Sequence, residues 1–440
     1  MKKALFVCLA TISLFNRVSY AGQYELMDIN GDRKVGLEEA VYALQVVAGI
    51  KTNATIEENT TITETIGYDN DNEDMIKIVT PANGIFQFTV ENLNVSGSEN
   101  GNIERCYLYH DYNAELIQVT YVADGGNSII RPGNMGTSSK IAVSENGTYY
   151  IKIKQYENHA AQYEMKTSLT ELKTVDSGES DNTYAEARLV RENETIISLI
   201  GYGYDEADWY KIQMSENGKF QFGIVNLHSE DVENGWIGKC YLYEKDDADL
   251  IQIAYVADGG NSIIRPGNSG ASSYIAVAKN RTYYIKVPKY EHHAAPYQIK
   301  TSFTELKTSD FGESNDIYND ARLIQENETV ISLIGYGNDE TDWYKIQMPA
   351  NGKFQFGIVN LHSENIGNGW IGKCYLYEKN GDELIHVAYV ADGGNSIIRQ
   401  GNSGASSDIA VSENGIYYIK VPKYEHHATP YQLETVFMPN

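Results

Sequence analysis

Apolar and polar residues alternate in short runs along most of the chain. In the run 353–358, apolar side chains occupy every second position, which is typical of a strand with one buried face. Turn-forming stretches such as 350–352 and 380–382 separate the runs, and no helical period appears between them. The C-terminal third of the chain is therefore predicted to hold eight strands, at 329–334, 342–348, 353–361, 373–378, 384–391, 408–412, 416–421 and 431–437. This pattern predicts an all-β, antiparallel sandwich.

The pattern occurs three times. Identical residues recur 134 positions apart, as in Cys106, Cys240 and Cys374, or Asp74, Asp208 and Asp342. A unit of that length is the size of a domain, not of a solenoid repeat. We expect β-sandwich repeats at 53–172, 173–306 and 307–440, with polar linkers at 173–182 and 307–316.

Charge and cysteine content narrow the functional classes. The formal net charge of −25 argues against nucleic acid as a partner, because phosphate binding needs a basic surface. Each repeat has one cysteine within a strand-like Cys-Tyr-Leu-Tyr run, so these cysteines are interpreted as small buried residues and not as a disulfide framework.

The first 21 residues are typical of an export signal. Lys2 and Lys3 precede the apolar stretch 4–15, and small residues follow at Ser19 and Ala21. The stretch is too short for a membrane span, and no later segment could form one. We therefore expect a secreted or cell-surface protein.

The segment 22–52 fits an EF-hand loop followed by an amphipathic helix at 37–48. Calcium prefers six to eight oxygen ligands, and the spacing of oxygen donors here matches such a loop. The expected ligands are Asp28, Asn30, Asp32, the backbone carbonyl of Lys34, and Glu39. Arg33 occupies the sharp-turn position that glycine normally takes, which weakens binding. The segment resembles one half of a dockerin-type pair. The alternative is an acidic turn before a helix.

Each repeat resembles the bacterial pre-peptidase C-terminal domain, whose relatives include the collagen-binding domains of clostridial collagenases. The matching segments are 205–212, 217–220, 240–243 and 283–287, with Tyr297, and their counterparts in the third repeat. The resemblance covers about residues 60–438. It implies a jelly-roll-like β-sandwich, secretion and an accessory role beside a catalytic domain. No catalytic domain is recognisable in this chain.

The resemblance also implies calcium sites where a linker meets its sandwich. Carboxylates that converge on one point repel each other unless a cation offsets their charge. The implied ligands are Glu179, Asp181, Asn182, Asp205 and Asp208 in the second repeat, and Glu313, Asn315, Asp316, Asp339 and Asp342 in the third. The first repeat has Asp71 and Asp74 but no linker acids, so no full site is expected there. The alternative is solvated turn chemistry.

Other motifs favour packing or turns over chemistry. His292 and His293 are adjacent, and adjacent side chains on a strand point to opposite faces, so the pair is a poor metal site. No nucleophile, catalytic metal motif or cofactor loop is apparent. Trp236 and Trp370 follow Asn-Gly turns and are interpreted first as packing and second as contacts to a polymer.

The leading hypothesis is a secreted, non-enzymatic array that binds calcium and an extracellular polymer, either a polysaccharide or a fibrous matrix protein. Three linked copies would raise avidity. The alternatives are a structural spacer or surface-layer element with no ligand beyond calcium, and a glycoside hydrolase with an unrecognised pair of carboxylates.

Overall fold

The computed structural model describes residues 55–56, 59–68, 71–125, 128–176, 181–259, 262–308, 315–362, 366–392 and 396–440. The predicted export signal (1–21) and the EF-hand-like loop and helix (22–52) lie outside the described residues. Strands and turns make up the described part, together with one 3-10 helix, η1 (Tyr318–Asp320). The described chain is thus all-β, as predicted. None of its described helices has the length and apolar character that a membrane span requires.

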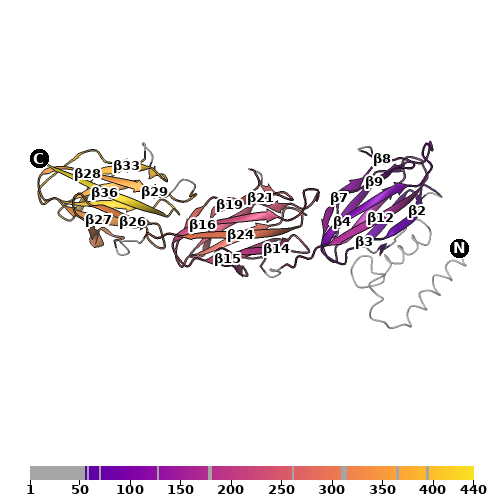
Figure 1. The fold of residues 1–440 in the computed structure, drawn as a ribbon, viewed down its shortest axis with the longest axis horizontal. Coiled ribbons are helices and arrows are strands. Elements are labelled where there is room, and N and C mark those ends of the chain that lie inside the picture. The colour runs from indigo at the N-terminus through magenta and orange to yellow at the C-terminus, as the bar shows by residue number, and fades with distance from the viewer. Residues whose placement is uncertain are drawn as a thin grey trace, which may run out of the picture. The chain divides into compact units, whose positions relative to one another are not determined.

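Every repeat contains a five-stranded sheet, called the first sheet, with the same strand order. Figure 1 shows the strands of the three repeats. The orders are β1-β3-β11-β6-β7, β13-β15-β23-β18-β19 and β25-β27-β35-β30-β31. The bounds are β1 (Thr55–Ile56), β3 (Glu73–Val79), β11 (Thr148–Lys154), β6 (Cys106–Tyr112), β7 (Glu115–Val122), β13 (Arg188–Leu189), β15 (Ala207–Gln213), β23 (Thr282–Pro288), β18 (Cys240–Asp246), β19 (Asp249–Val256), β25 (Arg322–Leu323), β27 (Thr341–Gln347), β35 (Ile416–Pro422), β30 (Cys374–Asn380) and β31 (Glu383–Val390).

The second sheet of each repeat also has five strands. Four of them form a continuous order, and the fifth pairs with one of the four. The sets are β2, β4, β9, β10 and β12; β14, β16, β21, β22 and β24; and β26, β28, β33, β34 and β36. The bounds are β2 (Thr61–Ile66), β4 (Gly84–Asn92), β9 (Met135–Thr137), β10 (Ile141–Val143), β12 (Ala161–Glu171), β14 (Thr195–Ile200), β16 (Gly218–Asn226), β21 (Ser269–Ala271), β22 (Ile275–Val277), β24 (Ala295–Glu305), β26 (Thr329–Ile334), β28 (Gly352–Asn360), β33 (Ser403–Ala405), β34 (Ile409–Val411) and β36 (Thr429–Pro439).

Short two-stranded sheets complete each repeat: β5 (Ile103–Glu104) with β8 (Ile129–Ile130), β17 (Ile237–Gly238) with β20 (Ile263–Ile264), and β29 (Ile371–Gly372) with β32 (Ile397–Ile398). Most neighbouring strands run antiparallel. The exceptions are the two-residue strands β1, β13 and β25, which pair in parallel with β3, β15 and β27. Each repeat is therefore a jelly-roll-like sandwich with one short parallel strand.

Period-two alternation produces the core between the two sheets. In β16, alternate residues from Gly218 to Asn226 are buried, which places Phe220, Phe222 and Ile224 inside. From the first sheet, Tyr210 and Cys240 pack into the same cluster. The three strand cysteines are buried and free, as the Cys-Tyr-Leu-Tyr pattern predicted. Because side chains alternate across a strand, the remaining positions of the first sheet form its outer face.

By its internal contacts the chain forms two compact units. Of the described residues, one unit comprises those up to 141 together with 145–170, and the other comprises 142–144 and those from 171 onward. The second unit contains both the second and the third repeats.

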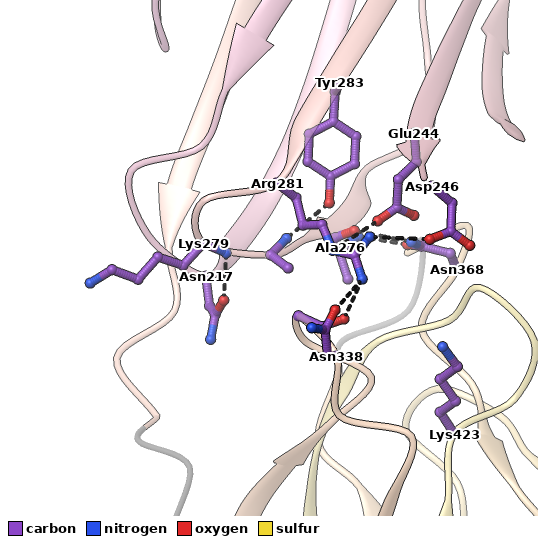
Figure 2. A network of polar contacts seen from close by, with 12 residues as sticks. Asn217, Glu244, Asp246, Ala276, Lys279, Arg281, Tyr283, Asn338, Asn368 and Lys423 are labelled. Carbon is purple, nitrogen blue, oxygen red and sulfur yellow. Dashed lines mark hydrogen bonds and ion pairs between the residues drawn. The ribbon is translucent and has the colours of Figure 1, made fainter. Parts of the chain in front are cut away.

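Within the second unit, polar contacts join the second and third repeats (Figure 2). The Oδ1 of Asn368 accepts the backbone N–H of Ala276 at 2.6 Å, and its Nδ2 donates to the Ala276 carbonyl at 3.0 Å. Arg281 of the second repeat donates to the carbonyl of Gly337 in the third repeat at 2.7 Å. Within the second repeat, Arg281 also forms an ion pair with Asp246 at 3.4 Å. An apolar cluster accompanies these contacts, made of Ala276, Ala278, Leu333, Tyr336, Ile366 and Ala428.

Candidate metal site

The described residues include only part of the predicted calcium ligands. The residues outside the described part are Asp28, Asn30, Asp32, Lys34, Glu39, Glu179 and Glu313. Their role as ligands stays a prediction. The remaining predicted residues occupy the ends of the second and third repeats where each linker arrives.

Three carboxylates converge in the second repeat. Asp176 lies in the linker, Asp205 lies in the turn between β14 and β15, and Asp208 is the second residue of β15. One oxygen atom from each lies within 4.8 Å of the other two. Asp208 is fully buried, whereas Asp176 and Asp205 are half-buried. Three negative groups are thus brought together where water cannot screen all of them.

A fourth carboxylate, Asp181, accompanies this cluster. Its side chain is 2% exposed, and its backbone carbonyl accepts the N–H of Trp209 at 3.0 Å. Both side-chain oxygens of Asp181 and the Oδ1 of Asp208 are buried without a hydrogen-bond donor. Leaving such atoms without a partner is costly, since buried polar groups are nearly always satisfied. A hard cation with oxygen ligands would satisfy them.

The pKa values of these carboxyl groups are raised, mainly by burial and in part by the neighbouring negative charges. Burial, followed by the Asp205 charge, raises the pKa of Asp208 to about 10. Burial is also the main cause that raises the pKa of Asp205 to about 7 and that of Asp181 to about 6. The cluster therefore carries its full negative charge at neutral pH only when something positive offsets it.

Backbone N–H groups near β15 hold the side chains of Asp205 and Asn182 in place. The N–H of Gly201 donates to Oδ2 of Asp205 at 3.0 Å, and Gly201 has a φ of 81°. A Cβ atom there would lie 2.2 Å from the carbonyl oxygen of His293, so the turn requires glycine. Asn182 is exposed, and its Oδ1 accepts the N–H groups of Glu206 and Ala207 at 3.0 and 3.3 Å. Asn182 thus ties the linker to β15 through a hydrogen bond.

Buried tyrosines support Asp208 from the core side. The hydroxyl of Tyr297 donates to Oδ2 of Asp208, and the hydroxyls of Tyr210 and Tyr297 are 2.5 Å apart. Burial and the Asp208 charge raise the pKa of Tyr297 far above its usual value, so its proton stays in place. One oxygen of Asp208 is therefore held by the core, and the other faces the cluster.

The third repeat has a similar arrangement. Tyr431 donates to Oδ2 of the buried Asp342 at 2.5 Å, and Asp339 accepts the N–H of Gly335 at 3.2 Å. Asn315 is 2% exposed, and its buried Oδ1 has no donor. Asp316, by contrast, is exposed.

The first repeat lacks the linker acids but keeps the carboxyl group in the strand. Tyr163 donates to the buried Asp74 at 2.8 Å. Burial and Asp74 raise the pKa of Asp71 to about 6.

Sequence reasoning overlooked Asp176. A signal was present, because Asp310 lies 134 residues later in the other linker. The family pattern drew attention to the acids closer to the sandwich. The hydroxyl of Ser198 donates to Oδ1 of Asp176 at 2.8 Å and so fixes this linker residue against β14.

Aromatic rings surround the linker and the nearby turns. Tyr184 packs edge-on against Trp209 and Tyr284, with ring centroids 6.2 and 5.9 Å apart. Trp236 is half-buried and stacks on His293 at 4.8 Å. The backbone N–H of Trp236 also donates to Nδ1 of His293 at 3.3 Å. Trp370 and His427 repeat this stacking at 4.8 Å, so each tryptophan packs against a histidine ring.

Among known proteins, the matches to this chain are solved structures. No protein-family model and no curated protein matches the sequence. Among solved structures, the chain is similar to the pre-peptidase C-terminal domain of a collagenase from Bacillus anthracis, at 20% identity and a TM-score of 0.20 over 26% of this chain and 94% of that domain. A triple jelly-roll protein of an archaeal virus matches at 10% identity and a TM-score of 0.16, over 88% of this chain and 85% of the viral chain. The CUB1-EGF-CUB2 domains of rat MASP-1 match at 9% identity and a TM-score of 0.18, over 57% of this chain and all of the other.

Proposed function

We propose that this chain is a secreted, non-catalytic protein that binds calcium where a linker meets its sandwich, and that it attaches to an extracellular polymer. The observation that supports calcium is the set of buried oxygens without donors on Asp181 and Asp208, next to Asp176 and Asp205. Calcium takes six to eight oxygens and tolerates irregular geometry, which suits carboxylates contributed by a linker, a turn and a strand.

Removing calcium tests the proposal. A ligand that binds only the folded chain raises its stability, by about 2.7 kcal/mol when its concentration is a hundred times its dissociation constant. We expect calcium to raise the midpoint of thermal unfolding and a chelator to reverse the effect. An unchanged midpoint would contradict the calcium site.

A substitution separates binding from general damage. Asp208→Asn removes a ligand charge but also relieves repulsion within the cluster. We expect the variant to lose the calcium response of the second repeat without losing stability in chelator. Asp74→Asn in the first repeat is the matched control, and its calcium response should equal that of the wild type. Calorimetric titration with calcium measures both.

The N-terminal loop that contains Asp28, Asp32 and Glu39 is proposed as a further calcium site. Its sharp-turn position holds Arg33, so we expect weaker binding there. Substituting Asp28 and Asp32 by alanine should remove one calcium equivalent from the titration and leave the cluster around Asp208 unaffected.

A glycoside hydrolase is less well supported than a binding protein. Its two carboxyl groups must flank a sugar, at about 5 Å or more from each other. Asp208 is fully buried and hydrogen-bonded to Tyr297, so a sugar ring cannot reach it.

Attachment to a polymer is tested by co-sedimentation with insoluble glycans and with collagen fibrils. Retention on either supports attachment. Failure on all of them would leave a calcium-binding spacer as the function.

A further inference from the structure

The outer face of the first sheet carries a recurring set of tyrosines and lysines. In the second repeat, Tyr241 on β18 lies directly opposite Tyr255 on β19 and Lys286 on β23. Lys239, just before β18, places its Nζ 3.6 Å above the centre of the Tyr255 ring. Residues directly opposite each other on neighbouring strands share one face of the sheet. We call Lys239, Tyr241, Tyr255 and Lys286 the Tyr–Lys cluster.

The third repeat has the same cluster. Tyr375 lies opposite Tyr389 and Lys420, and the Nζ of Lys373 is 3.4 Å above the Tyr389 ring. The ring of His386 is parallel to that of Tyr389 at 6.5 Å, which extends the aromatic surface.

The cluster is open to solvent. Tyr255 and Tyr389 are each 53% exposed, and the tyrosines and lysines beside them are half-buried. On one side the row continues into Trp209, which Tyr184 partly covers. Tyr255, Tyr241 and Lys286 lie on three neighbouring strands about 4.8 Å apart, so the open part of the row extends for about 10 Å. A row of this length accommodates more than one ring of an extended chain.

The charge on this face is opposite to that of the whole molecule. The chain carries a formal charge of −25, and lysines elsewhere on it, such as Lys279 and Lys353, form ion pairs with carboxylates. Within the part of the chain that the structure describes, the four lysines of the two clusters have no carboxylate partner: Lys239, Lys286, Lys373 and Lys420. Ammonium groups that contact aromatic rings but have no carboxylate partner are suited to a ligand that offers both anions and flat surfaces.

The first repeat has a similar set of residues, with one of its two cations neutralised. Tyr107 lies opposite Tyr121 and Lys152, and Arg105 lies over the Tyr121 ring at 4.3 Å. Here, however, Lys152 pairs with Glu73 at 2.7 Å. The second and third repeats have Ala207 and Thr341 at the position of Glu73, so their lysines stay available.

We propose that the Tyr–Lys clusters of the second and third repeats bind an anionic polysaccharide, with sugar rings on the tyrosines and carboxylate or sulfate groups on the lysines. This inference rests on the proposed function and names the class of polymer. A polysaccharide with a ring and an anion in each repeating unit matches the alternation of phenol and ammonium along the row. Tyrosine offers a flat apolar body with a polar tip, which suits a hydrated ring.

The test compares two forms of one polymer. The immobilised full-length chain is exposed to hyaluronan and to carboxyl-reduced hyaluronan at physiological ionic strength, with calcium and again with EDTA. We expect the carboxylated form to bind at least about tenfold more tightly in both buffers, and added salt to weaken it. Equal affinity for the two forms would overturn the proposal, and so would binding that requires calcium as a bridge.

Matched variants locate the surface. Tyr255→Ala with Tyr389→Ala should weaken binding at least about tenfold, whereas Tyr255→Phe with Tyr389→Phe should retain it. Lys239→Gln with Lys373→Gln should reduce both the affinity and its salt dependence. Lys279→Gln with Lys353→Gln, which changes exposed lysines elsewhere, should have no effect. An unchanged circular dichroism spectrum and melting midpoint establish that each variant is folded.

Collagen fibrils separate failure of this inference from failure of the proposed function. Retention on collagen that is lost in the Tyr→Ala variant, together with no binding of hyaluronan, would overturn the polysaccharide and leave polymer attachment in place. Absence of binding to every polymer would contradict both this inference and the proposed attachment to a polymer, and would leave a calcium-binding spacer.

Discussion

At the residue scale, burial explains most of the unusual ionisation in this protein. Carboxyl groups near the linkers have raised pKa values because they are buried together, and several histidines have lowered pKa values because their charged form is poorly solvated. The two effects have opposite consequences for acid stability. For the metal-free cluster, protonation accompanies folding, whereas for the histidines it opposes folding.

The buried histidines give a pH prediction. Burial lowers the pKa of His228 and of His362 from 6.5 to about 4. Between these two values the unfolded chain binds protons that the folded chain does not, so each histidine reduces stability as the pH falls through this window. The loss is about 1.4 kcal/mol per pH unit for each histidine. Above the upper value neither state is protonated, and the histidines add no pH dependence.

The double variant His228→Gln and His362→Gln isolates this contribution. It keeps an amide donor near the carbonyls of Ala294 and Ala428, which the histidines contact. Urea denaturation at about pH 7 and about pH 5 should show a smaller loss of stability in the variant than in the wild type. If the variant and the wild type lost equal stability between the two pH values, these histidines would have to become protonated in the folded chain.

At the element scale, the regular strands were predictable and the short ones were not. All eight strands predicted for the third repeat are confirmed, and β26 (Thr329–Ile334) has the predicted bounds. The strands β25, β29, β32 and β33 have two or three residues each, which is too short for an alternating pattern to appear. Tertiary pairing alone defines them.

For the candidate metal site, the sequence identified the acids on the strand and its preceding turn but not the more distant acid in the linker. The spacing of Asp205 and Asp208 on a strand and its preceding turn is a local feature, so a family pattern could identify both. Asp176 is separated from them by a linker whose path depends on Ser198 and β14. The outer-face tyrosines were visible as strand residues, but their pairing with lysines depends on the register between β18, β19 and β23.

The turn before β15 yields a prediction at this scale. Gly201→Ala would place a methyl group against the carbonyl of His293 in a backbone conformation that alanine disfavours. We expect a loss of more than about 1 kcal/mol in the free energy of unfolding. Because Gly201 also holds Asp205, calcium affinity should fall as well. Gly203→Ala is the control for a left-handed glycine, since a Cβ there meets no atom within 4 Å. Denaturation and calorimetry on both variants measure the difference.

At the scale of the whole molecule, the second and third repeats belong to one compact unit. Asn368 holds both backbone groups of Ala276, and the apolar cluster beside it includes residues from both repeats. These contacts predict that the two repeats unfold together.

Asn368→Ala should uncouple them. It leaves both backbone groups of Ala276 without their partner, at a cost of about 1–3 kcal/mol. We expect the shared calorimetric transition to broaden or divide. Asn100 takes the same position in the first repeat and is exposed, so Asn100→Ala should leave the transition unchanged. An undivided transition in Asn368→Ala would show that other contacts maintain the coupling.

The contact of Tyr184 with Trp209 provides an optical signal that needs no added label. Tyr184 follows Asp181 by three residues, and in the third repeat Tyr318 lies equally close to Trp343. The chain has four tryptophans, and two of them are therefore next to a linker. If a linker leaves its sandwich, water reaches the indole and its fluorescence emission shifts to longer wavelength. Stopped-flow mixing with EDTA could thus time the release of each linker.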